Sequence, residues 1–235
     1  MSAHRGKRRF LLALCGVFAL LFAGLGVWQV ERLRWKTDLI ARVDARLAAE
    51  PVPLARGETF VGKEAEYLKV RATGRFDHGK ETLVDALTER GKGYWVLTPF
   101  RTAERTLLVN RGFVPSERAK PATRAAGQVP GVVTVTGLIR LTEPGGRFLR
   151  ANRPGADLWY SRDVAAIARA RGLGRVEPFF LDADAAASPG GLPIGGLTVV
   201  RFRNSHLVYA LTWFALSALS LFGLVLTWKS KHKRG

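Results

Sequence analysis

Residues 204–214 have the sequence NSHLVYALTWF, and within them a polar segment rich in arginine becomes a membrane-spanning helix. From Leu207 to Trp228 no residue carries a formal charge. An apolar run of about 20 residues, each rising about 1.5 Å, crosses the hydrocarbon core of a bilayer. This run therefore predicts a transmembrane helix over residues 208–228, with His206 at its mouth.

One face of this predicted helix carries three rings close to the water boundary. His206, Tyr209, Ala210 and Trp213 are spaced at i, i+3, i+4 and i+7, which places them on one side of a helix. That side presents an imidazole, a phenol and an indole. Aromatic residues are also enriched at membrane interfaces for reasons of solvation alone. The spacing therefore marks a candidate site without defining its ligand.

A second apolar run lies near the start of the chain. Residues 10–30, FLLALCGVFALLFAGLGVWQV, are uncharged throughout. A signal peptide has a shorter apolar core of about 7–15 residues, so we expect a retained membrane helix, with a cleaved leader as the alternative. Trp28 and Trp228 are predicted to lie at interfaces. Small residues that would let the helix of residues 208–228 approach closely are Gly16, Ala19, Ala23, Gly24 and Gly26.

Both ends of the chain are basic. The tails of residues 1–9 and 229–235 hold eight of the 37 Lys and Arg residues and none of the 19 acidic ones. The positive-inside rule places both tails in the cytoplasm and residues 31–207 on the outer side of the membrane, in a periplasm or its organellar equivalent. The short basic start, without a serine-rich presequence, favours a bacterial inner membrane. Nucleic-acid binding is the other common reason for a net charge of +18, but the two spans account for the basic tails, and we expect a lipid bilayer and no nucleic acid as partner.

The segment between the spans has a pattern rich in strands. Helical spacing continues over residues 31–49 up to Pro51, and a second helix is predicted from the N-cap Asp163 to Gly172. Residues 102–105 are expected to form a hairpin turn, and residues 116–130 and 183–196 to be loops. Short runs of Val, Leu, Thr and aromatic residues predict strands at 67–76, 80–87, 94–102, 106–115, 132–140, 176–182 and 197–203. The fold class is α+β, with a mainly antiparallel sheet that is compatible with a barrel.

The signatures of common catalytic sites are missing from this sequence. Cys15 is the single cysteine, which excludes an intramolecular disulfide and a CxxC redox pair. The four histidines are scattered, and phosphate-binding, dinucleotide-binding and nucleophile-elbow motifs do not occur. A membrane protease using Ser205 with Lys36 or Lys69 is an alternative that no spacing supports. The sequence predicts a protein that is not an enzyme.

Several ordered motifs nevertheless run through the whole chain. They are GVWQVERLRWK at 26–36, YWVLTP at 94–99, VNRGFVP at 109–115, Gly137 with Arg140 and Glu143-Pro144, WYSRD at 159–163 and NSHLVYALTWF at 204–214. In this order and spacing they resemble the surfeit locus protein 1 family, assembly factors of haem–copper cytochrome c oxidase. Two positions depart from the family pattern: Ser205 replaces an asparagine common before the histidine, and Gly91-Lys92-Gly93 lacks a proline–glycine pair.

The resemblance implies a role in maturing subunit I of the oxidase, by binding haem a transiently and assisting its insertion. It implies His206 as the axial ligand of the haem iron, and subunit I and haem a synthase as partners. Beside this, the interfacial position would suit an amphiphilic haem. Tyr209, Trp213 and Trp28 could pack against the macrocycle, and its propionates could pair with the arginines Arg32, Arg34, Arg201 and Arg203. The plainer alternative is that these residues only anchor helix ends.

A second function class remains open at this point. The protein could be a scaffold without haem, whose outer domain holds the nascent subunit while the helices anchor it. The segment Asn110-Arg111-Gly112 is expected to shape a turn and a strand end, with Gly112 supplying backbone freedom and Arg111 a buried or interfacial hydrogen-bond fork.

Overall fold

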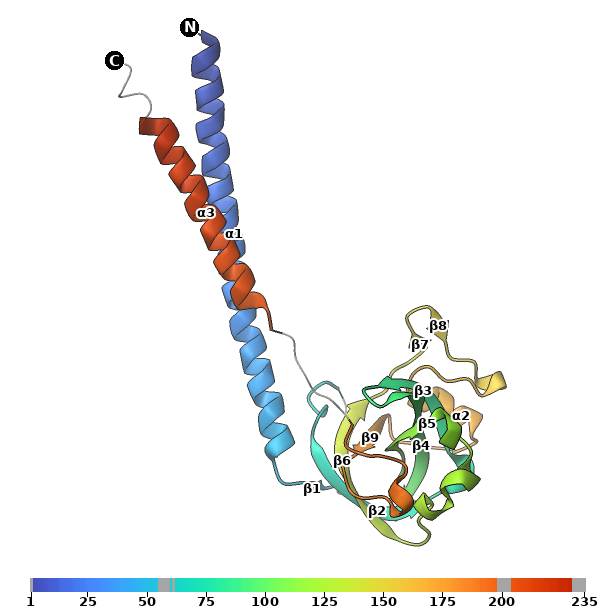
Figure 1. Ribbon diagram of the computed structural model, residues 1–235. Helices are drawn as coiled ribbons and strands as arrows, with labels where there is room; N and C mark the ends of the chain where they lie inside the picture. Colours follow the sequence, from blue (N-terminus) through green and yellow to red (C-terminus); the bar gives the residue numbers. More distant parts are fainter. Residues whose placement is uncertain (1, 55–59, 61, 198–203, 230–235) are drawn as a thin grey trace. The chain divides into compact units, whose positions relative to one another are not determined.

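The computed structural model describes residues 2–54, 60, 62–197 and 204–229. The chain divides into two units (Figure 1). One consists of residues 1–43 with 201–235 and contains the two long helices, and the other is a compact domain of residues 44–200. Residues 31–43 thus group with the helices. Each unit is considered by itself.

The two long helices are α1 (Ser2–Ala48) and α3 (His206–Lys229). Both are long and apolar enough to cross a membrane, as the two uncharged runs predict. The helix expected over residues 31–49 is the continuation of α1, because no glycine or proline interrupts the chain between Val27 and Ala48. The membrane span therefore passes into a polar helical extension without a break.

The two helices run antiparallel and meet along a face of small residues. Ala19 is buried, and its carbonyl oxygen accepts a hydrogen bond from Ser217 Oγ at 2.8 Å. Gly26 lies so close to Phe214 that a Cβ there would stand 2.6 Å from the ring. The predicted close approach is thus confirmed at both positions. At Gly24 it is wrong, because a Cβ there would meet no atom within 4 Å.

The compact domain is built around a closed barrel. Its strands are β1 (Val52–Pro53), β2 (Lys69–Phe76), β3 (Thr82–Thr88), β4 (Gly91–Thr102), β5 (Thr106–Pro115), β6 (Val133–Leu141), β7 (Gly146–Arg147), β8 (Arg150–Ala151) and β9 (Phe179–Ala183). Strands β2, β6, β9, β5 and β4 follow one another around the barrel, and β4 pairs with β2 to close it. Only β5–β9 and β1–β2 are parallel. The predicted α+β class with a mainly antiparallel sheet is confirmed.

Short helices cover the connections between the strands. One α-helix, α2 (Val164–Ala170), is capped by Asp163, whose side chain accepts from the Ala166 N–H at 3.0 Å as predicted. The 3₁₀ helices are η1 (His78–Lys80), η2 (Ser116–Arg118), η3 (Pro121–Gly127), η4 (Pro154–Ala156) and η5 (Pro189–Gly191). Because η1 occupies residues 78–80, β3 starts two residues later than predicted.

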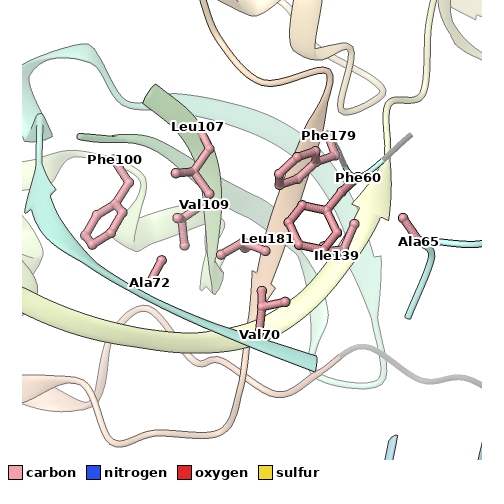
Figure 2. Packing of buried hydrophobic residues seen from close by; sticks show 10 residues of the cluster. All are labelled: Phe60, Ala65, Val70, Ala72, Phe100, Leu107, Val109, Ile139, Phe179 and Leu181. Carbon is pink, nitrogen blue, oxygen red and sulfur yellow. The ribbon is translucent and has the colours of Figure 1, made fainter. Parts of the chain in front are cut away.

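Alternation of side chains along β5 and β9 produces two cores. Leu107, Val109, Phe179 and Leu181 point into the barrel (Figure 2). Their neighbours Leu108 and Phe180 point outward and pack with Trp159 and Ile167, beneath α2. The barrel wall at these two strands is therefore buried on both sides.

Two strand predictions need comment. The strand expected at 197–203 lies outside the described residues except for Leu197, which is not in a strand. The expectation that Asn110-Arg111-Gly112 forms a turn and a strand end is wrong, because all three lie inside β5. Gly112 has φ +125°, and its Cα lies against the backbone of Ile194, which hydrogen-bonds with Phe113 in both directions.

We expect Gly112→Ala to destabilise the domain strongly. The new Cβ would stand 2.1 Å from the Ile194 carbonyl oxygen, and the backbone would hold a positive φ that alanine disfavours. The expected loss is about 3 kcal/mol or more, lowering Tm by roughly 6–12 °C in thermal unfolding of the detergent-solubilised protein.

Gly131→Ala is the matched control for this change. Its φ is +84°, but a Cβ would meet no atom within 4 Å, so only strain of about 1–2 kcal/mol is expected. Equal Tm losses in the two variants would show that the close contact with Ile194 does not add to the cost of a Cβ at position 112.

Candidate functional site

His206 is the first residue of α3, and its ring is held by α1. Its Nδ1 lies 2.7 Å from Oε1 of Gln29, a buried residue of α1. A carbonyl oxygen can only accept a hydrogen bond, so Nδ1 carries the proton and donates it to Gln29. In the neutral form of the ring this leaves Nε2 as the unprotonated nitrogen, which is the atom that can bind a metal.

The ring-bearing face of α3 divides between the helix interface and its exposed side. Trp213 stacks on Phe22 of α1 with ring centroids 5.6 Å apart, and Ala210 is buried. Tyr209 is about 60° around the helix from His206 and is exposed. The structure thus turns His206, Ala210 and Trp213 towards α1 and leaves Tyr209 outside.

The other predicted site residues lie on α1 or outside the described residues. Trp28 is next to Gln29 in the chain and is exposed. The guanidinium of Arg32 lies over the Trp35 ring, 4.1 Å from its centroid, in a cation–π contact. Arg201 and Arg203 lie outside the described residues. Propionate pairing by these arginines stays a prediction.

Gln29 is the residue of this site that sequence reasoning missed. A signal was present, because it is the only side chain with an amide or a hydroxyl in residues 10–30. A polar group inside a membrane span calls for a partner, and the first histidine of the other span is the nearest candidate in an antiparallel pair.

This arrangement can bind a metal ion that is already held in a largely apolar organic group. His206 supplies one fixed nitrogen donor at the end of a helix pair. Around it the side chains of Leu207, Val208 and Tyr209 are exposed, as expected for residues in contact with lipid. In the part of the chain that the structure describes, no three His, Cys, Asp or Glu side chains gather to hold a bare metal ion.

Comparison with known proteins covers both helices and the domain between them. A model of the SURF1 family matches residues 16–218. Surfeit locus protein 1 of Homo sapiens is 41% identical over 230 residues, which covers 90% of this chain and 74% of that protein. The chain belongs to the SURF1 family. Surfeit locus protein 1 of Gallus gallus is 42% identical, and the match covers 84% of this chain and 69% of the Gallus gallus protein. A SURF1-like protein of Monosiga brevicollis is 40% identical, covering 89% and 84%.

Several motifs of this SURF1-family chain meet in one buried charge network on the barrel wall. Asp182 of β9 is only 2% exposed. It accepts from Asn110 Nδ2 at 2.7 Å, and its carboxylate lies 3.4 Å from Arg140 Nη1 and 3.3 Å from Arg162 Nη1. Arg162 also forks onto Glu143. Burial alone would lower the pKa of Arg162, but its bonds to Glu143 and the charge of Asp182 raise it. The network joins β5, β6, β9 and the loop before α2.

A second buried cluster surrounds Arg111. Its guanidinium donates to the Gly127 carbonyl, lies 3.4 Å from His78 Nδ1 and stacks over Phe76. Burial lowers the pKa of Arg111 to about 10. The predicted buried hydrogen-bond fork of Arg111 is confirmed. Beside it Arg124 pairs through both terminal nitrogens with Glu81.

Next to this cluster the domain has an open cavity of about 780 Å³. Its lining includes Leu83 of β3, Tyr94 of β4 and Tyr160. Four charged residues of its lining pair with one another: Arg171 with Asp157 at 2.7 Å and Arg150 with Asp85 at 3.8 Å. The cavity is thus a mixed surface suited to a polypeptide rather than to a strongly charged small molecule.

We expect the stability of this domain to fall in mild acid because of His78. Burial lowers the pKa of its imidazole below 6.5, and the charge of Arg111 lowers it further. The neutral ring donates from Nε2 to the Val129 carbonyl at 3.0 Å and accepts from Arg111 at Nδ1. The unfolded chain takes up a proton that the folded domain resists, so this contribution is complete above pH 6.5 and is lost as the pH falls below it.

The measurement is Tm between about pH 7.5 and about pH 5 for the wild type and for His78→Gln, which cannot be protonated in this range. The wild type should lose more Tm than the variant. All carboxylates and the other histidines are common to both proteins, so any difference between the two curves reports on His78. Parallel curves would therefore contradict this assignment.

Proposed function

We propose that this protein assists the assembly of haem–copper cytochrome c oxidase by binding haem a and helping its insertion into subunit I. Its membership of the SURF1 family supports the general role. The observation that carries the haem proposal is the contact between His206 Nδ1 and Gln29 Oε1. It gives a membrane-boundary imidazole one defined tautomer with a free Nε2.

The residues of the helix pair have distinct parts in this proposal. When bound, haem a would supply an iron whose axial position takes the Nε2 of His206. Gln29 acts through His206: its carbonyl oxygen orients the ring and makes Nε2 a better donor, as outer partners of ligating histidines do. The exposed side chains of Trp28 and Tyr209 provide apolar and aromatic surface beside it. A single imidazole holds haem less firmly than two, which suits a protein that must release it.

The proposed placement follows from charge and hydropathy. The protein would lie in a bacterial inner membrane as a multi-pass protein, with both termini in the cytoplasm and residues 31–207 in the periplasm. Arg32 and Arg203 would lie at the outer boundary, where a haem propionate could reach a guanidinium. Subunit I and haem a synthase are the proposed partners, since one receives haem a and the other releases it.

The second candidate function is a scaffold that holds the nascent subunit without haem. The cavity on the outer domain favours it, because aromatic side chains and balanced charges in its lining suit a polypeptide. In that case outer-domain substitutions would impair oxidase assembly, and changes at His206 would not.

Replacement of His206 should remove haem from the protein. The wild type and His206→Ala would be purified in detergent from cells that make haem a, and their absorption spectra compared. We expect a haem band in the wild type and none in the variant. Thr212→Val is the matched control, because its hydroxyl only bonds back to Val208 in its own helix and its loss should leave the band intact.

Equal bands in the wild type and His206→Ala would move the ligand elsewhere. A colourless wild type that is folded would favour the scaffold.

Loss of the Gln29 acceptor should weaken the site without removing the ligand. In Gln29→Leu the ring loses its fixed tautomer, and we expect haem affinity to fall about 10–100-fold in a titration of the apoprotein. Gln29→Glu keeps an acceptor oxygen and should restore most of the affinity and the spectrum. Wild-type affinity in Gln29→Leu would exclude a positioning role for this residue.

A further inference from the structure

The hairpin β7–β8 ends in the most exposed apolar side chains of the described outer domain. A two-residue tip, Phe148 and Leu149, joins the strands, and these side chains are 90% and 88% exposed. Figure 1 shows the hairpin standing clear of the barrel. Single exposed apolar residues are common on protein surfaces, but here an aromatic and an aliphatic side chain are adjacent at the end of a projecting turn.

The residues of this tip are also not those that stabilise a two-residue turn best. Two-residue hairpin turns favour Gly, Asn or Asp where φ is positive. Here Leu149 has φ +63°, a conformation that branched apolar residues seldom adopt. The hairpin thus keeps an exposed leucine at a position where glycine or asparagine would fit better. This departure from turn chemistry indicates a role for the side chain itself.

The charged residues of the hairpin itself are all basic. Arg147 and Arg150 flank it directly and face each other across the hairpin, and Arg153 follows. No residue from Pro144 to Ala156 is acidic. Arg150 pairs with Asp85 at 3.8 Å but its side chain stays 63% exposed, and Arg147 and Arg153 are exposed as well. Apolar side chains between arginines form the pattern by which peripheral segments enter a bilayer surface, the rings below the headgroups and the guanidiniums on the phosphates.

We propose that the β7–β8 tip inserts Phe148 and Leu149 into the anionic surface of the membrane that α1 and α3 cross. The chain connects the outer domain at both of its ends to membrane helices, so this bilayer is present at a high effective concentration. The tip is convex and basic, which matches an anionic lipid surface. Insertion gives the domain a third point of attachment and selects one orientation of the barrel above the bilayer. The proposal does not depend on haem binding.

The test uses the full chain in nanodiscs, with one dye at a time. In a Cys15→Ser background the chain has no cysteine, so Phe148→Cys can carry a single environment-sensitive thiol dye. Leu87→Cys is the matched control, because Leu87 is 76% exposed near the β3–β4 turn of the same domain. Quenching by spin-labelled lipid and by aqueous iodide would be measured in nanodiscs containing phosphatidylglycerol, and again in phosphatidylcholine alone.

We expect lipid quenching at position 148 to exceed that at position 87 by about threefold or more, with blue-shifted emission and protection from iodide. Arg147→Gln with Arg153→Gln, or removal of phosphatidylglycerol, should reduce this difference. A label at 148 that is no better quenched by lipid than the one at 87 would overturn the proposal and leave a protein partner as the target of the tip. Leu149→Cys gives an independent reading if labelling of Phe148→Cys disturbs the domain, as judged by Tm.

Discussion

Strand β5 is buried on both of its faces, and the compact domain of residues 44–200 depends on that double burial. Leu107 and Val109 fill the barrel, while Leu108 lies beneath α2 in the second core. Further along the same strand, Asn110 reaches the buried Asp182 and Arg111 reaches the cluster around His78. Both faces of a strand can carry such contacts only if it lies inside the wall of the fold, between β4 and β9. The VNRGFVP motif is therefore explained by packing and hydrogen bonding within the domain.

The membrane helices are held by a different balance of forces. Between lipid-facing helices there is little hydrophobic gain, so close contact and hydrogen bonds decide the pairing. Gly26 gives room for the Phe214 ring, and Ser217 bonds to the Ala19 carbonyl. The hydrogen bond between Gln29 and His206 is another such contact. It brings together the GVWQ and NSH segments, although 177 positions separate Gln29 from His206.

Local pattern predicted the elements of this fold better than their connections. The bounds of β5 agree with the strand predicted at 106–115, and Asp163 caps α2 as its sequence context indicates. Closure of the barrel by β2 with β4 and the parallel pairing of β5 with β9 join distant segments, and no local signal specifies them. For the same reason Asn110-Arg111-Gly112 resembled a turn: glycine and asparagine favour turns locally, and the partners Asp182 and Ile194 are far away in the chain. In the candidate site, His206 could be predicted from its position at the helix mouth, whereas Gln29 was recognisable only after the two helices were paired.

The helix pair is closed by unlike contacts at its two ends. At one end Arg8 of α1 donates to the carbonyls of Thr227 and Trp228, at 3.2 and 3.3 Å, in the last turn of α3, where the helix dipole favours a cation. Near the middle Ser217 and Ala19 are buried against each other. Towards the opposite end Gly26 packs against the Phe214 ring, and Gln29 hydrogen-bonds with His206. Because the Gln29 contact uses only Nδ1 of His206, a ligand can bind the other ring nitrogen while the helix pair stays assembled.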